Sequence, residues 1–329
     1  MHRSTLDSPP FLGIIRCVTR VIGGDVGGTK CLLRCVEADG RVSAQARFES
    51  AGFASFDDLL GEFLRLHPGP VRAACFAVAG AVLHGRAEVT NLGWVIDETR
   101  LEQRFGISRV SLINDFYGIA LGVPFLADDD LLVLHPASRE RTAPISILGA
   151  GTGLGEANVI FLADQWTVVP GEGGHADFAP QDAEQGRLLL FLQEKYAGRV
   201  SWERLLSGMG LENTYEFLTG RSELPVRIAE LAAEGDDAAV RTFHIFVDLY
   251  GAEAGNMALR VLARGGVFLA GGIAGKNLPF FTDGRFVEAF RRKGRFSDFM
   301  ATVPVYLILN EEVGLLGAVE QARRIGIVA

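Results

Sequence analysis

One arrangement of short strands occurs twice in this chain, and it restricts the possible folds more than any other feature of the sequence. The first copy predicts three strands, over residues 18–24, 31–37 and 41–48. The second copy predicts three more, over residues 144–148, 157–162 and 166–169. In each copy glycines separate the first two strands, and Asp39-Gly40 marks a hairpin turn in the first copy. A meander that recurs in this way indicates an internal duplication.

Each meander is followed by helices and further strands. In the first half, Ser55 and Asp58 predict a capping box, the apolar residues after Ser55 have helical spacing, and Pro68-Gly69 ends that helix. Helices are expected over residues 55–67, 116–122, 182–196, 201–207, 211–219, 236–263 and 312–324. Further strands are expected over residues 71–79, 110–113, 267–270 and 303–309. Strands that alternate with helices predict an α/β fold.

Composition excludes several classes of function. Lys and Arg total 32 against 40 Asp and Glu, a net charge of −8 without a long basic run, so no nucleic-acid partner is expected. The longest uncharged stretch, residues 142–155, is shorter than the ~20 residues that a membrane-spanning helix needs, so no membrane partner is expected. The four cysteines have no zinc-site spacing and are expected to be buried thiols of a cytoplasmic protein. Residues 1–20 are interpreted as an extension that is disordered in part.

Glycine is the unusual component, with 40 residues, and many of them lie in loops that could hold a ligand. The first such loop joins two predicted strands, and its exposed backbone N–H groups predict phosphate binding. Its candidate residues are Gly24, Asp25, Val26, Gly27, Gly28 and Thr29. The Asp25 carboxylate suits a Mg²⁺ ion beside that phosphate. The structural alternative is an ordinary tight hairpin.

The second glycine loop occupies the matching place in the other half, so the two loops could hold one polyphosphate from both sides. Its candidate residues are Gly149, Gly151, Thr152 and Gly153. A strand follows the loop, and Glu156 replaces the last glycine of a Rossmann fingerprint, so a dinucleotide site is excluded. A third pair, Gly271-Gly272, either approaches a flat ring such as adenine or forms a strand-to-helix turn, and the residues alone do not decide between these.

Polar residues follow two of the predicted strands. Asn114 and Asp115 end a buried strand, where α/β proteins place their ligands, and Asp115 could accept a proton from a hydroxyl that attacks a phosphoryl group. The structural alternative for this pair is capping of the helix that follows. Glu172 and His175 flank two glycines that would let a ligand approach, and the two side chains suit vicinal hydroxyls.

The alternatives for these and two further residues stay open at this point. His175 could be a core histidine and Glu172 a surface residue. Glu203 follows Ser201 in the first turn of a predicted helix, where the helix dipole alone favours a carboxylate. Asn91 could be a turn residue.

Seven segments, taken in order and with their spacing, resemble the bacterial-type glucokinases outside the ROK group, in the hexokinase/actin-like ATPase superfamily. They are GDVGGT at 24–29, TNLGW at 90–94, LINDF at 112–116, GAGTGLG at 149–155, PGEGGHADFAP at 170–180, ERLLSG at 203–208 and AGGI at 270–273. The resemblance extends from about Val21 to the C-terminus. Lys30 departs from the Asn of many such glucokinases and matches the ROK sugar kinases. The ROK cysteine motif is absent, since no cysteine follows Cys75, so no structural zinc is expected.

The resemblance implies a duplicated actin-like ATPase (ribonuclease H-like) fold with two α/β domains and a ligand cleft between them. The smaller domain would comprise residues 21–125 and 312–329, and the larger one residues 126–311. The implied reaction transfers the γ-phosphoryl group of ATP to the 6-hydroxyl of glucose with Mg²⁺, as a step of glycolysis in the cytoplasm. A homodimer is implied as well.

The resemblance also assigns roles to the candidate residues. Asp115 matches the general base. The glucose-binding positions are Asn91, Asn114, Asp115, Glu172, His175 and Glu203. The two glycine loops match the phosphate loops, and Gly271-Gly272 matches the adenosine contact. The alternatives are a kinase for mannose or an N-acetylhexosamine, and a non-enzymatic sugar sensor on the same fold.

Overall fold

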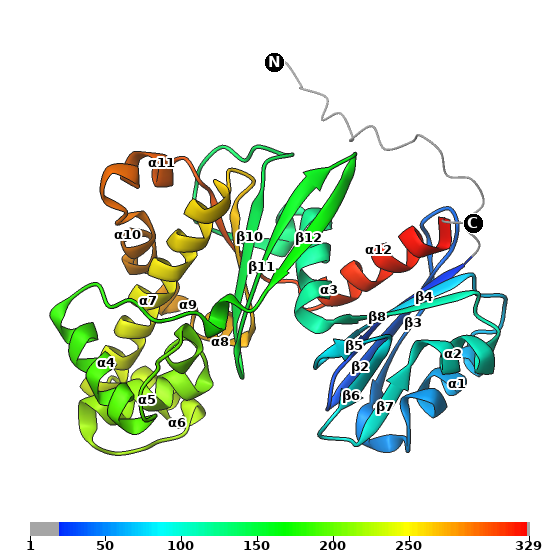
Figure 1. Ribbon diagram of the computed structural model, residues 1–329, viewed down its shortest axis with the longest axis horizontal. Coiled ribbons are helices and arrows are strands. Elements are labelled where there is room, and N and C mark those ends of the chain that lie inside the picture. Colours follow the sequence, from blue (N-terminus) through cyan, green and yellow to red (C-terminus); the bar gives the residue numbers. More distant parts are fainter. Residues whose placement is uncertain (1–19, 328–329) are drawn as a thin grey trace. The chain divides into compact units, whose positions relative to one another are not determined.

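The computed structural model describes residues 20–327, and the chain divides into two compact units (Figure 1). The first unit comprises Met1–Gly118 and Gly314–Ala329, and the second comprises Ile119–Val313. Of the expected extension over residues 1–20, residues 1–19 lie outside the described residues. Among the residues that the structure describes, no helix is long and apolar enough to cross a membrane.

The first unit is built on a five-stranded sheet with the order β3-β2-β1-β4-β8. Its strands are β1 (Val21–Val26), β2 (Lys30–Val36), β3 (Val42–Glu49), β4 (Ala73–Val78) and β8 (Arg109–Asn114). The first three form the predicted antiparallel meander, and β4 and β8 add to β1 in parallel. A second sheet, which was not predicted, contains β5 (Val82–Leu83), β6 (Arg86–Val89) and β7 (Trp94–Asp97).

Helices cover both faces of this sheet. Apolar side chains of α1 (Phe56–Leu66) and α2 (Glu98–Phe105) pack on one face together with the small sheet. The closing helix α12 (Val313–Ile327) packs on the other face, as Figure 1 shows in red. Because the parallel strands β1, β4 and β8 share a direction, their carboxyl ends meet at one edge. This edge carries Asp25 and Asn114.

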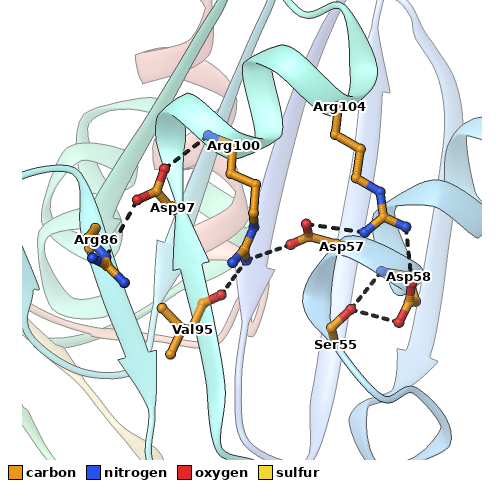
Figure 2. Close-up of polar contacts among 8 residues, drawn as sticks. All are labelled: Ser55, Asp57, Asp58, Arg86, Val95, Asp97, Arg100 and Arg104. Atoms are coloured by element: carbon orange, nitrogen blue, oxygen red, sulfur yellow. Dashed lines mark hydrogen bonds and ion pairs between the residues drawn. The ribbon is translucent and has the colours of Figure 1, made fainter.

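A polar network ties α1 to α2 (Figure 2). Ser55 caps α1 by accepting a hydrogen bond from the Asp58 N–H, as predicted. The Asp57 carboxylate is only 4% exposed and accepts from Arg100 Nη2 at 2.8 Å and from Arg104 Nη1 at 3.3 Å. Arg100 also donates to the carbonyl oxygen of Val95. The buried carboxylate therefore holds two cations of the neighbouring helix.

Asp57→Ala is expected to lower the midpoint of thermal unfolding by several degrees, because it leaves two arginines without their buried partner, a loss of about 1–3 kcal/mol. Glu62→Ala is the matched control, since it removes an exposed ion pair with Arg65 from the same helix. Exposed pairs contribute about 0–1 kcal/mol, so this control should shift the midpoint little. Equal shifts in the two variants would contradict the role of Asp57.

The second unit contains a six-stranded sheet with the order β12-β11-β10-β13-β14-β9. Its strands are β9 (Leu131–His135), β10 (Ile145–Ala150), β11 (Leu154–Leu162), β12 (Gln165–Gly171), β13 (Val267–Ala270) and β14 (Val305–Ile308). A meander of β10, β11 and β12 is again followed by two strands parallel to the first, β13 and β14. The shared order and direction confirm the internal duplication.

Helices of the second unit pack around the buried helix α7. The helices after β8 are α3 (Asp115–Gly122), α4 (Ala183–Lys195), α5 (Gly208–Thr219), α6 (Pro225–Glu234), α7 (Asp237–Val261), α8 (Gly272–Lys276), α9 (Leu278–Thr282), α10 (Arg285–Arg291) and α11 (Ser297–Ala301). One expected helix was wrong: residues 201–207 form only a short 3-10 turn over Trp202–Arg204. The expected long helix is confirmed as α7, whose C-cap Leu262 takes a left-handed conformation at φ +51°.

Candidate active site

The residues that the sequence predicts as functional fall into two groups, one in each unit, and each group is described by itself. The first group gathers at the carboxyl edge of β1, β4 and β8. The second gathers where β10 and β13 end and β11 begins.

In the first unit, Asn114 connects a strand to a helix and fixes a carboxylate. Its Oδ1 accepts hydrogen bonds from the N–H groups of Phe116, at 2.9 Å, and Tyr117, at 3.2 Å, so the capping alternative is confirmed. Its Nδ2 donates to Asp115 Oδ1 at 2.9 Å and to the carbonyl oxygen of Gly80 at 3.0 Å. Capping therefore does not compete with function here, because the same side chain orients Asp115.

Asp115 and Asp25 form a pair of partly buried carboxyl groups. Burial raises the pKa of Asp115, while hydrogen bonds from Phe116 and Asn114 act in the opposite direction. Burial is also the main reason why the pKa of Asp25 rises to about 6, with the charge of Asp115 adding to it and Lys30 opposing it. Two carboxyl groups in such surroundings can serve as a proton acceptor and as an oxygen ligand for a hard cation.

The first glycine loop is shorter than the sequence predicts. The turn closes with a hydrogen bond from Gly27 N–H to the Lys30 carbonyl oxygen, at 3.0 Å, and Asn91 lies against Gly28. Gly24 instead lies within β1, where a Cβ atom would come within 2.6 Å of Phe76 and 2.7 Å of Leu33. Packing in the sheet, rather than approach of a phosphate, explains that glycine.

Ser50 supports this loop and was not among the predicted residues. Its buried hydroxyl donates to the Gly27 carbonyl oxygen at 2.9 Å, and its N–H donates to the Thr29 carbonyl oxygen at 2.9 Å. One residue thus fixes both ends of the turn. Nothing in the sequence signals a contact that spans more than 20 positions and depends on the pairing of β2 with β3.

The second glycine loop consists of Gly151, Thr152 and Gly153, between β10 and β11. The Gly151 N–H donates to the Gly153 carbonyl oxygen, and the Gly208 N–H at the start of α5 donates to the Gly151 carbonyl oxygen, both at 2.9 Å. Gly149, a further candidate, lies inside β10 and pairs with Gly155. The exposed part of the predicted loop is therefore its tip.

Gly271 and Gly272 lie beside that tip, because β13 runs parallel to β10 with Ala270 opposite Gly149. Gly271 has φ +85°, and a Cβ atom there would collide with the Ala150 carbonyl oxygen. Gly272 begins α8 and is exposed. The strand-to-helix turn is confirmed, and it brings two glycine segments together at one edge of the sheet.

Glu203 connects the second glycine loop to the predicted sugar-binding residues. Its Oε2 accepts a hydrogen bond from the Leu154 N–H at 3.0 Å, and its Oε1 lies 3.9 Å from His175 Nδ1. A Cβ atom on Gly153 would come within 2.5 Å of Glu203 Oε2. The glycine is thus needed for the carboxylate to reach the loop, and the helix dipole alone does not explain Glu203.

His175 and Glu172 are presented to solvent. The side chain of His175 is 58% exposed, and its Nε2 lies 3.9 Å from Glu172 Oε2. The core-histidine alternative is therefore wrong, whereas Glu172 is a surface residue, as its alternative stated. Arg199 holds this segment by donating to the His175 carbonyl oxygen and to the Asp177 carboxylate. This arginine was not among the predicted residues.

The two glycines between these residues have a different role from the one expected. We expected Gly173 and Gly174 to let a ligand approach. Instead, a Cβ atom on Gly173 would collide with Glu156 Oε2, and one on Gly174 would collide with the Leu154 carbonyl oxygen. These glycines let the segment lie directly on β11.

Known proteins are similar to this chain in sequence. The profile of the Glucokinase family matches residues 22–325. The glucokinase of Nostoc sp. (strain PCC 7120) is 38% identical, over 94% of this chain and 100% of its own. The glucokinase of Yersinia enterocolitica is 35% identical, over 90% of this chain and 94% of its own.

Solved structures are similar as well. The crystal structure of a glucokinase from an Antarctic psychrotroph superposes with a TM-score of 0.87 at 29% identity, covering 94% of this chain and 100% of that one. A glucokinase from Balamuthia mandrillaris, solved in complex with glucose, gives a TM-score of 0.76 at 23% identity, covering 93% and 94% of the two chains. At 23% identity, the similarity to the Balamuthia mandrillaris glucokinase shows a shared fold alone.

Proposed function

The chain belongs to the glucokinase family, and from this premise we propose how its residues transfer the γ-phosphoryl group of ATP to the 6-hydroxyl of glucose. The fold is the duplicated actin-like ATPase fold of this superfamily. One observation carries the proposal: the two oxygens of Glu203 face the second glycine loop and His175. A kinase needs its phosphate and sugar sites to be contiguous, and this residue belongs to both.

Phosphoryl transfer depends on positioning and on neutralising charge more than on covalent chemistry. Asp115 accepts the proton of the 6-hydroxyl and directs that oxygen toward the γ-phosphorus atom. Asn114 holds the Asp115 carboxylate in place through its Nδ2. Hydrogen bonds from other polar side chains bind the remaining hydroxyls of the sugar. These residues are Asn91, Asn114, Glu172, His175 and Glu203.

Backbone N–H groups of the glycine turns bind the phosphates of ATP, and Gly271-Gly272 lies against its adenosine. The Asp25 carboxyl fits a Mg²⁺ ion, since it is a hard oxygen ligand in a partly buried position beside Asp115. Within residues 20–327 no three acidic, His or Cys side chains form a ready metal cluster, so phosphate and water oxygens would complete the coordination. The ion would offset the charge of the phosphates.

Asp25→Asn is expected to raise the Mg²⁺ concentration for half-maximal activity by about tenfold, because an amide oxygen binds a hard cation more weakly than a carboxylate. Titrating Mg²⁺ at a fixed ATP concentration measures this shift. Asp39→Asn is the matched control, since Asp39 lies at the exposed β2–β3 turn. An unchanged Mg²⁺ dependence in Asp25→Asn would remove Asp25 from the metal site.

We further propose that the protein acts in the cytoplasm, as a homodimer, at the entry of glucose into glycolysis. The sensor alternative is disfavoured, because a protein that only binds sugar has no need of the oriented Asp115 carboxylate. Steady-state kinetics with ATP across glucose, mannose, fructose and N-acetylglucosamine test the sugar assignment. Glucose should give the highest kcat/KM. A higher value for another hexose would assign the site to that sugar.

A further inference from the structure

The buried residue Glu156 lies beneath the predicted sugar-binding segment, residues 172–175, and no step of the reaction above uses it. Its side chain is 3% exposed. It lies on β11, where its backbone pairs with Gly171 of β12, the residue directly before Glu172. Glu156 therefore lies close to Glu172, one of the proposed sugar-binding residues.

The segment rests on two residues of β11. Glu156 Oε2 occupies the place of the missing Cβ atom of Gly173, and the Leu154 carbonyl oxygen occupies that of Gly174. Both glycines lie between Glu172 and His175. The position of the Glu156 carboxyl therefore determines how closely the backbone that carries these two side chains packs on β11.

On its other side, Glu156 faces polar residues of α7. Arg260 Nη1 lies 3.7 Å from Glu156 Oε2, while Arg260 Nη2 lies closer to Glu253, at 3.1 Å. Asn256 donates to Glu253 at 2.8 Å, and Lys293 donates to Asn256 at 2.6 Å. Within the described part of the chain, Glu156 Oε1 has no hydrogen-bond partner. A buried carboxyl group with such weak pairing adds little to the stability of the fold. An apolar side chain at this position would stabilise the fold at least as well.

The charge of this carboxyl can change near neutral pH. Burial, with the charge of Glu253 adding to it and Arg260 opposing it, raises the pKa of Glu156 to about 8. Tyr250 of α7 also faces it and remains protonated, since burial raises the pKa of its hydroxyl. Burial lowers the pKa of Lys293 to about 8, but its ammonium group contacts Asn256 and the Ala252 carbonyl oxygen rather than Gly173.

We propose that Glu156 is a positioning residue for the glucose site, whose neutral carboxyl supports Gly173 and thereby fixes Glu172 and His175. This inference rests on the proposed function of that segment. Ionisation of Glu156 would place a negative charge against the backbone of Gly173 and beside Glu253, and Arg260, which lies closer to Glu253, would compensate it only in part. The segment would then shift, and sugar affinity would fall while the chemical step stays intact.

Three variants test this role. Simple destabilisation of the fold would not change the KM for glucose while leaving kcat and the KM for ATP unchanged. Glu156→Ala should raise the KM for glucose about tenfold, with kcat and the KM for ATP within about twofold. Glu156→Gln keeps the shape of the side chain but cannot ionise. It should match the wild type at pH 7 and abolish the rise in glucose KM that the wild type shows above pH 8, although Lys293 still titrates. Asn256→Ala, the matched control, disturbs the same cluster without contacting Gly173 and should leave the KM for glucose unchanged.

An unchanged glucose KM in Glu156→Ala, or the same rise above pH 8 in Glu156→Gln as in the wild type, would overturn the inference. Calorimetric titration of glucose separates this failure from failure of the proposed function. If the wild type phosphorylates no hexose, the proposed function fails. The role of Glu156 is then supported by weaker glucose binding in Glu156→Ala and overturned by an unchanged Kd.

Discussion

Asp115→Asn is expected to lower kcat by about 10²–10⁴-fold, because an amide cannot accept the proton of the attacking hydroxyl. The KM for glucose should change little. The asparagine side chain has the same shape, and its oxygen can still accept the hydrogen bond that Asn114 Nδ2 donates to Asp115 Oδ1. A loss confined to kcat is the signature of a group that acts in the transition state.

Coupled detection of ADP gives kcat for this variant, and calorimetric titration gives its affinity for glucose. Asp39→Asn makes the same chemical change at an exposed turn of the same unit and should retain full activity. If Asp115→Asn kept a near-normal kcat, Asp115 would not be the base. If the variant lost glucose binding together with kcat, Asp115 would instead be a ligand of the sugar only.

Glu203→Ala is expected to lower kcat/KM for glucose by about 10²–10³-fold, since it removes two interactions of one carboxylate. The hydrogen bond from the Leu154 N–H to this charged group contributes about 1.5–3 kcal/mol, and the contact with His175 Nδ1 at 3.9 Å adds to it. The loss of the first leaves the Leu154 N–H at the start of β11 without its acceptor, and the loss of the second frees His175. Both the glycine loop and the sugar-binding segment should become less ordered.

Glu203→Gln separates these two effects. The amide oxygen can still accept from the Leu154 N–H, so the KM for ATP should recover, whereas the lost charge keeps the KM for glucose raised. Glu172→Gln is the comparison, because the side chain of Glu172 is 88% exposed and lies 3.9 Å from His175 Nε2, so this variant should raise the glucose KM by less. Glu203→Ala with a kcat/KM within threefold of the wild type would remove Glu203 from the site.

The duplicated architecture could be predicted from the sequence because its signals are local. Glycines and turn residues mark the meanders, Ser55 caps α1, and helical spacing predicts α1 and α7. The position of Asn114-Asp115 at the end of a buried strand was likewise visible. The strands β5, β6 and β7, by contrast, have two to four residues each, too few to show a period.

The contacts that complete the candidate site could not be predicted, because they join residues far apart in the chain. Glu203 reaches Leu154 across 49 positions, and Ser50 reaches Gly27 across 23. Glycines pose a related problem. A glycine-rich segment shows that something approaches the backbone closely, but not what approaches it. At Gly24 the neighbours are Phe76 and Leu33, and at Gly173 the neighbour is Glu156.

Direct identification of the product tests the central claim, which is phosphoryl transfer from ATP to the 6-hydroxyl of glucose. Purified protein would be incubated with Mg²⁺, ATP and glucose and followed by phosphorus NMR. Glucose 6-phosphate and ADP are expected in equal amounts, with no consumption of ATP when glucose is omitted. Release of inorganic phosphate irrespective of glucose, or phosphate on a different hydroxyl, would contradict it.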